Sequence, residues 1–180
     1  MEPGICADAP LWWAMSAVYN RSLVVASQLS DAGIGSFVPM HETVRLQGGR
    51  RIVASEPAVR NLIFVRACTE VLKALKAEMP HLQYLVRREG QRNYPIIVSD
   101  VAMDDFIRVS RMTTATPRYF TPDELSLTTG SRVRIIGGEL HGICGTFVRV
   151  KGARSRRLVI LLDGVLAIAA EVSPDLVEVL

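Results

Sequence analysis

Residues 130–150 read Gly-Ser-Arg-Val-Arg-Ile-Ile-Gly-Gly-Glu-Leu-His-Gly-Ile-Cys-Gly-Thr-Phe-Val-Arg-Val. Two runs within this stretch, residues 133–136 and 147–150, alternate apolar side chains with arginine, which is the period-two pattern of half-buried strands. Glycines lie between the runs, where φ can be positive or where another backbone must come close. The glycines are Gly137, Gly138, Gly142 and Gly145. The stretch therefore predicts a strand, a tight loop and a second, kinked strand.

The composition allows a folded chain with a mildly basic surface. The 180 residues are 49% hydrophobic, enough for packed cores in one ordinary domain or two small ones. A formal net charge of +3 permits a nucleic-acid partner without requiring one. No uninterrupted apolar run approaches the roughly 20 residues of a membrane-spanning helix. A soluble protein without a membrane partner is expected.

Three cysteines, Cys6, Cys68 and Cys144, lie far apart and form no Cys-x-x-Cys pair. This spacing argues against a disulfide framework and against a structural zinc site. A reducing, cytoplasmic compartment is the expectation.

The first 110 residues alternate strand patterns with helix patterns. Strands are expected at residues 12–18, 37–46, 52–53, 62–65 and 82–86, and helices at residues 23–32, 70–78 and from 104 onward. The apolar run 62–65 suits a central strand, and the turn at residues 47–51 suits a hairpin whose two arginines are exposed. Residues 111–126 turn to Thr, Pro and Ser without a clean period, which is typical of a linker. The fold class expected is α+β, with an antiparallel sheet and flanking helices over residues 1–110 and a small β-barrel over residues 127–180.

Several short segments resemble known modules. The glycine-rich stretch resembles a KOW motif, an SH3-like barrel in which Gly142 and Gly145 hold the paired-glycine positions. Three segments resemble the NGN domain: Trp-Trp-Ala-Met at residues 12–15, Ser-Glu-Pro at 55–57 followed by Asn-Leu-Ile-Phe-Val-Arg at 61–66, and Pro-Ile-Ile-Val-Ser at 95–99. Nearly the whole chain is similar to the NusG family of transcription factors, in which an NGN domain precedes a KOW domain. The Glu-Pro and Phe-Val-Arg details are more similar to specialised paralogues that act as antiterminators on long operons, including polysaccharide loci.

The resemblance implies a docking surface for RNA polymerase. In the family the NGN domain binds the clamp helices of the largest polymerase subunit in an apolar depression. By position this role is carried over to Leu62, Phe64 and Met103, with Tyr84 and Phe106 as neighbours. The alternative is that all five side chains are ordinary core.

The resemblance also implies contact with upstream duplex or displaced non-template DNA. The candidate residues are Asn20, Arg21, Arg50 and Arg51, because phosphate contact needs clustered cations. Solvated arginines are the alternative. Where relatives commonly have Phe-Pro-Gly/Asn-Tyr, residues 59–62 read Val-Arg-Asn-Leu, so the polymerase-facing pocket is expected to differ.

The KOW half carries a basic hairpin and an apolar loop. In the family this domain binds a small ribosomal protein or a termination factor. The candidate residues for such a partner are Arg149, Lys151, Arg154, Arg156, Arg157, Val165, Leu166 and Ile168. The glycines and β-branched runs favour a stable five-stranded barrel over a refolded helical form, since each glycine costs a helix about 1 kcal/mol.

Catalysis has little support in the sequence. His41, His81 and His141 are scattered, and no glycine-rich loop carries the Lys-Ser/Thr of a phosphate cradle. A monomeric transcription elongation or antitermination factor without a cofactor or metal is therefore expected, and not an enzyme. The alternative is a ribosome- or RNA-binding KOW protein that does not bind polymerase.

Overall fold

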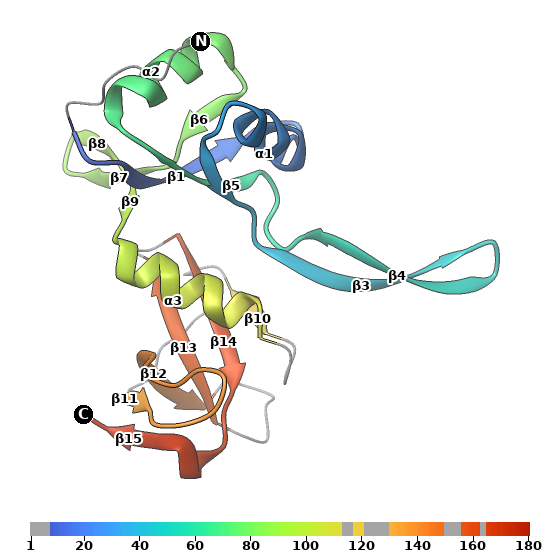
Figure 1. Cartoon of the computed structure of the whole chain (residues 1–180), viewed down its shortest axis with the longest axis vertical. Coiled ribbons are helices and arrows are strands. Elements are labelled where there is room, and N and C mark those ends of the chain that lie inside the picture. Colours follow the sequence, from blue (N-terminus) through green and yellow to red (C-terminus); the bar gives the residue numbers. More distant parts are fainter. Residues whose placement is uncertain (1–7, 113–116, 121–129, 150–155, 163–164) are drawn as a thin grey trace. The chain divides into compact units, whose positions relative to one another are not determined.

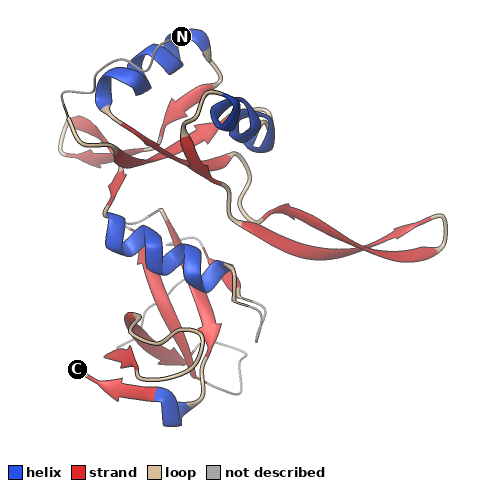
Figure 2. Ribbon diagram, in the orientation of Figure 1, coloured by secondary structure: helices blue, strands red, loops and turns tan. Residues whose placement is uncertain are grey.

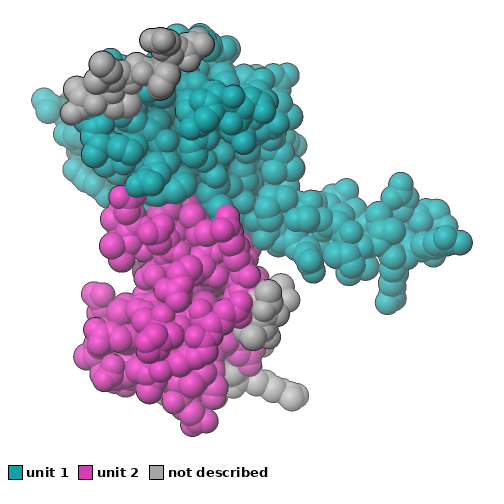
Figure 3. Space-filling view, viewed as in Figure 1, with its two compact units in different colours: residues 1–98 teal, residues 99–180 magenta. Residues whose placement is uncertain are grey.

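The structure is a computed structural model that describes residues 8–112, 117–120, 130–149, 156–162 and 165–180. It divides into two compact units, residues 1–98 and residues 99–180 (Figures 1 and 3). The fold class is α+β, with a sheet and helices in the first unit and a mainly β second unit. This confirms the fold class predicted from the sequence.

Unit 1 is built on an antiparallel sheet. Its elements are β1 (Leu11–Ala17), α1 (Ser22–Asp31), β2 (Gly35–Phe37), β5 (Leu62–Ala67), α2 (Thr69–Glu78), β6 (Leu82–Tyr84) and β9 (Ile97–Val98). The strand order is β2-β5-β1-β6, and β9 also pairs with β1. The continuous apolar run at 62–65 therefore lies on an interior strand, as the sequence predicted.

The two faces of this sheet differ in what they contact. Odd-numbered residues of β1 and β5, such as Trp13 and Ile63, share one core with buried residues of both helices, including Leu29 and Leu72. The helices and strands of unit 1 are distinguished by colour in Figure 2. The Trp13 indole also donates a hydrogen bond of 2.9 Å to the Ala67 carbonyl. Because side chains alternate along a strand, the even-numbered residues point to the opposite face. That second face carries Trp12, Ala14, Leu62 and Phe64, all of them buried.

Two hairpins of unit 1 lie outside the main sheet. The first pairs β3 (Met40–Gln47) with β4 (Arg50–Pro57) and extends as a ribbon from the rest of the unit (Figure 1). The second pairs β7 (Val86–Glu89) with β8 (Arg92–Pro95). Gly48 and Gly49 close the first hairpin with φ of 57° and 77°, as a two-residue type I′ turn requires. The sequence predicted the first hairpin and missed the second.

Unit 2 contains a six-stranded antiparallel sheet. Its elements are α3 (Asp100–Ser110), β10 (Arg118–Phe120), β11 (Ser131–Ile135), β12 (Cys144–Arg149), β13 (Arg156–Leu162), β14 (Leu166–Glu171), a 3-10 helix (Pro174–Leu176) and β15 (Val177–Val179). The strand order is β10-β14-β13-β12-β11-β15. Strands β11, β12 and β13 correspond to apolar runs that the sequence predicted as strands, whereas β14 includes residues 166–168, which the sequence placed in a loop. Strand β10 lies in the segment expected to be a linker, where it pairs with β14 because Tyr119 and Phe120 gain burial there.

Helix α3 belongs to unit 2. Ser99 caps its first turn by accepting a hydrogen bond of 3.3 Å from the Ala102 backbone amide. Met103, Phe106 and Val109 are fully buried and recur at helical spacing, and the helix packs against β13 and β14. The division between the two compact units falls before α3. The N-terminal domain over residues 1–110 that the sequence suggests stays a prediction. An amphipathic pattern shows that one helix face is buried without showing which sheet buries it.

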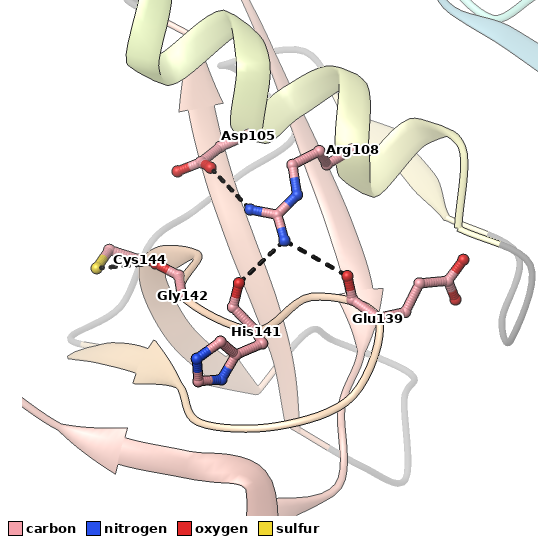
Figure 4. Close-up of polar contacts among 6 residues, drawn as sticks. All are labelled: Asp105, Arg108, Glu139, His141, Gly142 and Cys144. Carbon is pink, nitrogen blue, oxygen red and sulfur yellow. Dashed lines mark hydrogen bonds and ion pairs between the residues drawn. The ribbon is translucent and has the colours of Figure 1, made fainter.

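Arg108 attaches α3 to the loop between β11 and β12 (Figure 4). One guanidinium nitrogen donates to the carbonyls of His141 and Glu139 at 2.9 and 3.5 Å. Another lies 3.8 Å from the Asp105 carboxylate. Burial raises the pKa of Asp105, while the Arg108 charge acts in the opposite direction.

Tyr119 provides a titration test of the packing of α3. Its ring lies 6.1 Å from that of Phe106, and burial raises the pKa of its phenol to about 12. Because the folded pKa exceeds the unfolded value of 10.0, this phenol stabilises the fold fully below pH 10 and the contribution is lost as pH rises toward 12. Burial also raises the pKa of Tyr84, but the phenolate step near pH 12 in an alkaline titration should be the one that Tyr119→Phe removes. A step near pH 12 that persists in Tyr119→Phe would contradict this prediction.

Among the described residues, no helix is long and apolar enough to cross a membrane, and no group of His, Cys, Asp and Glu side chains could hold a metal ion. Cys68, at the start of α2, is disulfide-bonded, whereas the Cys144 thiol is free. The expectation from cysteine spacing is therefore wrong for Cys68. Spacing along the sequence does not report which thiols the fold brings together.

Candidate functional site

The turn after β1 meets the residues before β5 at one corner of unit 1. The Asn20 backbone amide donates a 2.8 Å hydrogen bond to the Asn61 side-chain oxygen. The Arg60 guanidinium donates one of 2.8 Å to the Asn20 side-chain oxygen. We call this set the β1–α1 corner; it comprises Tyr19, Asn20, Arg21, Arg60 and Asn61.

The backbone of the corner is held in an uncommon conformation. Tyr19, Asn20 and Asn61 have φ of 65°, 58° and 64°, in the left-handed region that non-glycine residues seldom adopt. Asparagine tolerates this region, but for tyrosine it costs about 1–2 kcal/mol. The two hydrogen bonds between segments 40 residues apart hold this geometry in place. Strain of this kind is concentrated at functional sites.

The corner presents an aromatic ring beside two cations. Tyr19 is 82% exposed, and Arg21 and Arg60 are both exposed. Guanidinium groups suit phosphate oxygens, and an exposed ring suits stacking by an unpaired base. The corner therefore has the chemistry to bind nucleic acid. The sequence predicted Asn20 and Arg21 and missed Tyr19, Arg60 and Asn61, although Arg60 and Asn61 lie in the segment that departs from the family pattern.

Asn61 permits a matched test of how the corner is built. Asn61→Ala removes the acceptor for the Asn20 amide and places a less tolerant residue at positive φ, so we expect a loss of about 1–2 kcal/mol of unfolding free energy. Asn61→Gly removes the same hydrogen bond but tolerates the φ and should cost less. Urea denaturation of both variants measures the difference. Equal destabilisation by the two variants would show that backbone strain contributes nothing.

The five residues expected to form the polymerase-docking surface are divided between the units: Leu62, Phe64 and Tyr84 belong to unit 1, and Met103 and Phe106 belong to unit 2. Leu62 and Phe64 share the second face of the unit 1 sheet. Tyr84 pairs with Met15 and so faces the helix-covered side, where it lies 5.7 Å from the Trp13 ring and beneath the Lys76 ammonium. Tyr84 is therefore core-packed and separate from Leu62 and Phe64. The register of β6 on β1, which no local sequence pattern reports, decides this.

Met103 and Phe106 lie on α3 in unit 2, where both are fully buried. Within unit 2, the Phe106 ring lies 6.1 Å from the Tyr119 ring. Their role in docking stays a prediction.

Arg50 and Arg51 lie at the tip of the β3–β4 ribbon, where both are exposed. Arg45, nearer the base of the ribbon, forms an ion pair with Glu56. The ribbon extends from the body of unit 1, so its tip and the β1–α1 corner are separate cationic sites (Figure 1).

The residues expected to bind a partner of the KOW domain have mixed placements. Leu166 and Ile168 are buried in β14, an interior strand, so this apolar run is core and not a binding loop. Arg157 is also buried and lies 3.6 Å from the Glu171 carboxylate, which makes it a structural cation. Val165 is half-buried. The remaining four lie outside the described side chains: Arg149, Lys151, Arg154 and Arg156.

Comparisons with known proteins place the chain in a family. The family model "Transcription termination factor nusG" matches residues 10–107, which is 98 of the 180 residues. The solved structure titled "Domain interaction in Thermotoga maritima NusG" is 15% identical, with a TM-score of 0.45, and the match covers 95% of this chain and 97% of that one. No curated protein matches. On the family match, which spans more than half of its length, the chain belongs to the NusG family of transcription factors.

Proposed function

We propose that the chain is a transcription elongation and antitermination factor that binds RNA polymerase through unit 1 and suppresses pausing or termination. The observation that carries this proposal is the family match over residues 10–107, which includes all the described strands and helices of unit 1. The resemblance of the Glu-Pro and Phe-Val-Arg segments to specialised paralogues supports a role on particular long operons. The protein acts by binding and needs no cofactor.

The clamp helices of the largest polymerase subunit are the proposed partner of the second sheet face. Trp12, Ala14, Leu62 and Phe64 are apolar residues on this face, and all four are buried. Leu62 and Phe64 are buried, so we assign them to the floor of the docking surface, where they fix its shape. Apolar floors with polar rims are typical of protein interfaces.

The cationic sites extend the contact to nucleic acid. Arg21 and Arg60 at the corner, and Arg50 and Arg51 at the ribbon tip, are exposed and suited to phosphate. A factor that holds both polymerase and displaced DNA shifts the pausing equilibrium by its differential affinity for the elongating state. Each tenfold shift requires about 1.4 kcal/mol.

The test is binding of the full chain to purified core polymerase, followed by transcription through a pause site. We expect stable binding and shorter pauses, and we expect Arg21→Gln with Arg60→Gln to lengthen the pauses again while binding persists. Arg111→Gln with Arg132→Gln removes the same charge from exposed arginines of unit 2 and serves as the control. Failure to bind polymerase would refute the proposal.

The competing function is RNA or ribosome binding without polymerase, favoured by the basic KOW hairpin. Phosphate-driven binding weakens steeply with salt, whereas an apolar contact does not. Side-by-side salt titrations with RNA and with polymerase distinguish the two. Strong, salt-sensitive RNA binding without polymerase binding would favour this alternative.

A further inference from the structure

The β7–β8 hairpin is a short basic hairpin of unit 1, and its sequence has no apolar periodicity that would predict it. Its strands have four residues each, and all eight strand residues are exposed. The hairpin carries three arginines, Arg87, Arg88 and Arg92, against one acid, Glu89. The hairpin buries no apolar side chain, so its residues do not contribute to the hydrophobic core of unit 1.

The register places an aromatic ring among cations. Arg87 pairs with Tyr94, and Glu89 pairs with Arg92. Side chains alternate along a strand, so these four residues share one face, with paired Cβ atoms about 4.5–5.5 Å apart. Tyr94 therefore has Arg87 across the ladder and Arg92 two residues away on its own strand, and its side chain is 42% exposed.

The two arginines on this face differ in their interactions with the rest of the chain. The Arg87 guanidinium lies 2.9 Å from the Glu89 carboxylate. The Arg92 side chain makes no hydrogen bond or ion pair with any part of the chain that the structure describes. Arg88 points to the other face and donates to the Gly90 carbonyl at 3.3 Å. An anion at this face meets Arg92 directly and competes with Glu89 for Arg87.

We propose that this face binds single-stranded nucleic acid, with a base stacked on Tyr94 and the flanking phosphates held by Arg92 and Arg87. A ring between guanidinium groups offers the two contacts that single strands require, stacking and charge neutralisation. Duplexes keep their bases stacked inside and cannot use Tyr94. The site is separate from the β1–α1 corner and does not depend on polymerase binding. DNA and RNA share the chemistry used here.

The test is fluorescence anisotropy of labelled oligo(dT) and oligo(rU) with the full chain. Tyr94→Ala should weaken binding about tenfold without changing its salt dependence, and Tyr94→Phe should bind like the wild type. Arg92→Gln should weaken binding and reduce the slope of log K against log salt by about 0.7. The tighter oligonucleotide identifies DNA or RNA as the preferred strand. Equal affinity of Tyr94→Ala and wild type, or undiminished binding of a duplex that competes for the site, would overturn the proposal.

Substitution of Glu89 provides a second test, in which binding is expected to become tighter. Glu89→Gln releases Arg87 and should tighten binding several-fold. Glu178→Gln is the matched control, because it makes the same charge change and releases Arg134 from a 3.7 Å ion pair in unit 2. Tighter binding by Glu89→Gln alone supports the assignment. Equal tightening by both variants would show a non-specific effect of net charge and overturn it. Circular dichroism confirms that each variant is folded.

Discussion

Replacing Phe64 with aspartate is expected to unfold unit 1. Phe64 is fully buried on β5, an interior strand, where it pairs with Ala14 of β1 and Phe37 of β2. Loss of the ring costs about 3–5 kcal/mol, and a buried, unpaired carboxylate adds several more. Since domains are stable by only about 5–15 kcal/mol, the variant should lose most or all of its folded population. Circular dichroism and amide hydrogen exchange over β1 and β5 measure this.

The same result sets a limit on docking experiments. Loss of polymerase binding by Phe64→Asp reports unfolding, so the informative variant is Phe64→Leu, which keeps an apolar side chain of smaller volume. We expect Phe64→Leu to remain folded and to cost about 1–2 kcal/mol. Native-like exchange protection in Phe64→Asp would show that this face of the sheet is not core.

Replacing Gly145 with valine is expected to disrupt the sheet of unit 2. A Cβ at this position in β12 would lie 2.7 Å from the Val159 carbonyl oxygen and 2.8 Å from a Leu158 methyl carbon. Because the carbonyl belongs to the adjacent strand β13, the backbone itself must move. We expect a loss of about 3 kcal/mol or more, at the upper end of overpacking. Hydrogen exchange in β12 and β13 measures the change.

Gly142 serves as the control position for Gly145, because glycine is required there for its backbone conformation and not for lack of space. Its φ is 85°, and a Cβ added there would meet no described atom within 4 Å. Gly142→Ala should therefore cost only the strain of a left-handed backbone, about 1–2 kcal/mol, and Gly142→Asn less. Equal losses of unfolding free energy for Gly142→Ala and Gly145→Val would contradict this difference between the two glycines.

The sequence predicted those parts of the fold that have a local pattern. The apolar run of β5, the paired turn glycines of the β3–β4 hairpin and the glycine-spaced strands of unit 2 were all recognisable. The β7–β8 hairpin was missed because its strands alternate no apolar residues. Strand β10 was missed because its three residues are ordered by β14, some 50 residues further along.

The β1–α1 corner could be predicted only for residues that are close together in the sequence. Asn20 and Arg21 were identified as a polar turn beside a helix, but Arg60 and Asn61 join them across 40 residues through hydrogen bonds that no periodicity reports. Tyr84 was grouped with Phe64 by position in the family that the chain resembles. The Phe64 and Tyr84 side chains point to opposite faces of the sheet because of the registers in which β5 and β6 pair with β1.

The adjacent tryptophans of β1 give unit 1 a separate optical reporter on each face of its sheet. The chain has two tryptophans, and they point to opposite faces because they are neighbours in one strand. Trp12→Phe leaves emission from the helix-covered face alone, and Trp13→Phe leaves emission from the face of Leu62 and Phe64. A partner that docks on the second face should shift the emission of the Trp13→Phe protein and leave that of the Trp12→Phe protein nearly unchanged. Spectroscopy can thus locate a binding event on this sheet without an attached label.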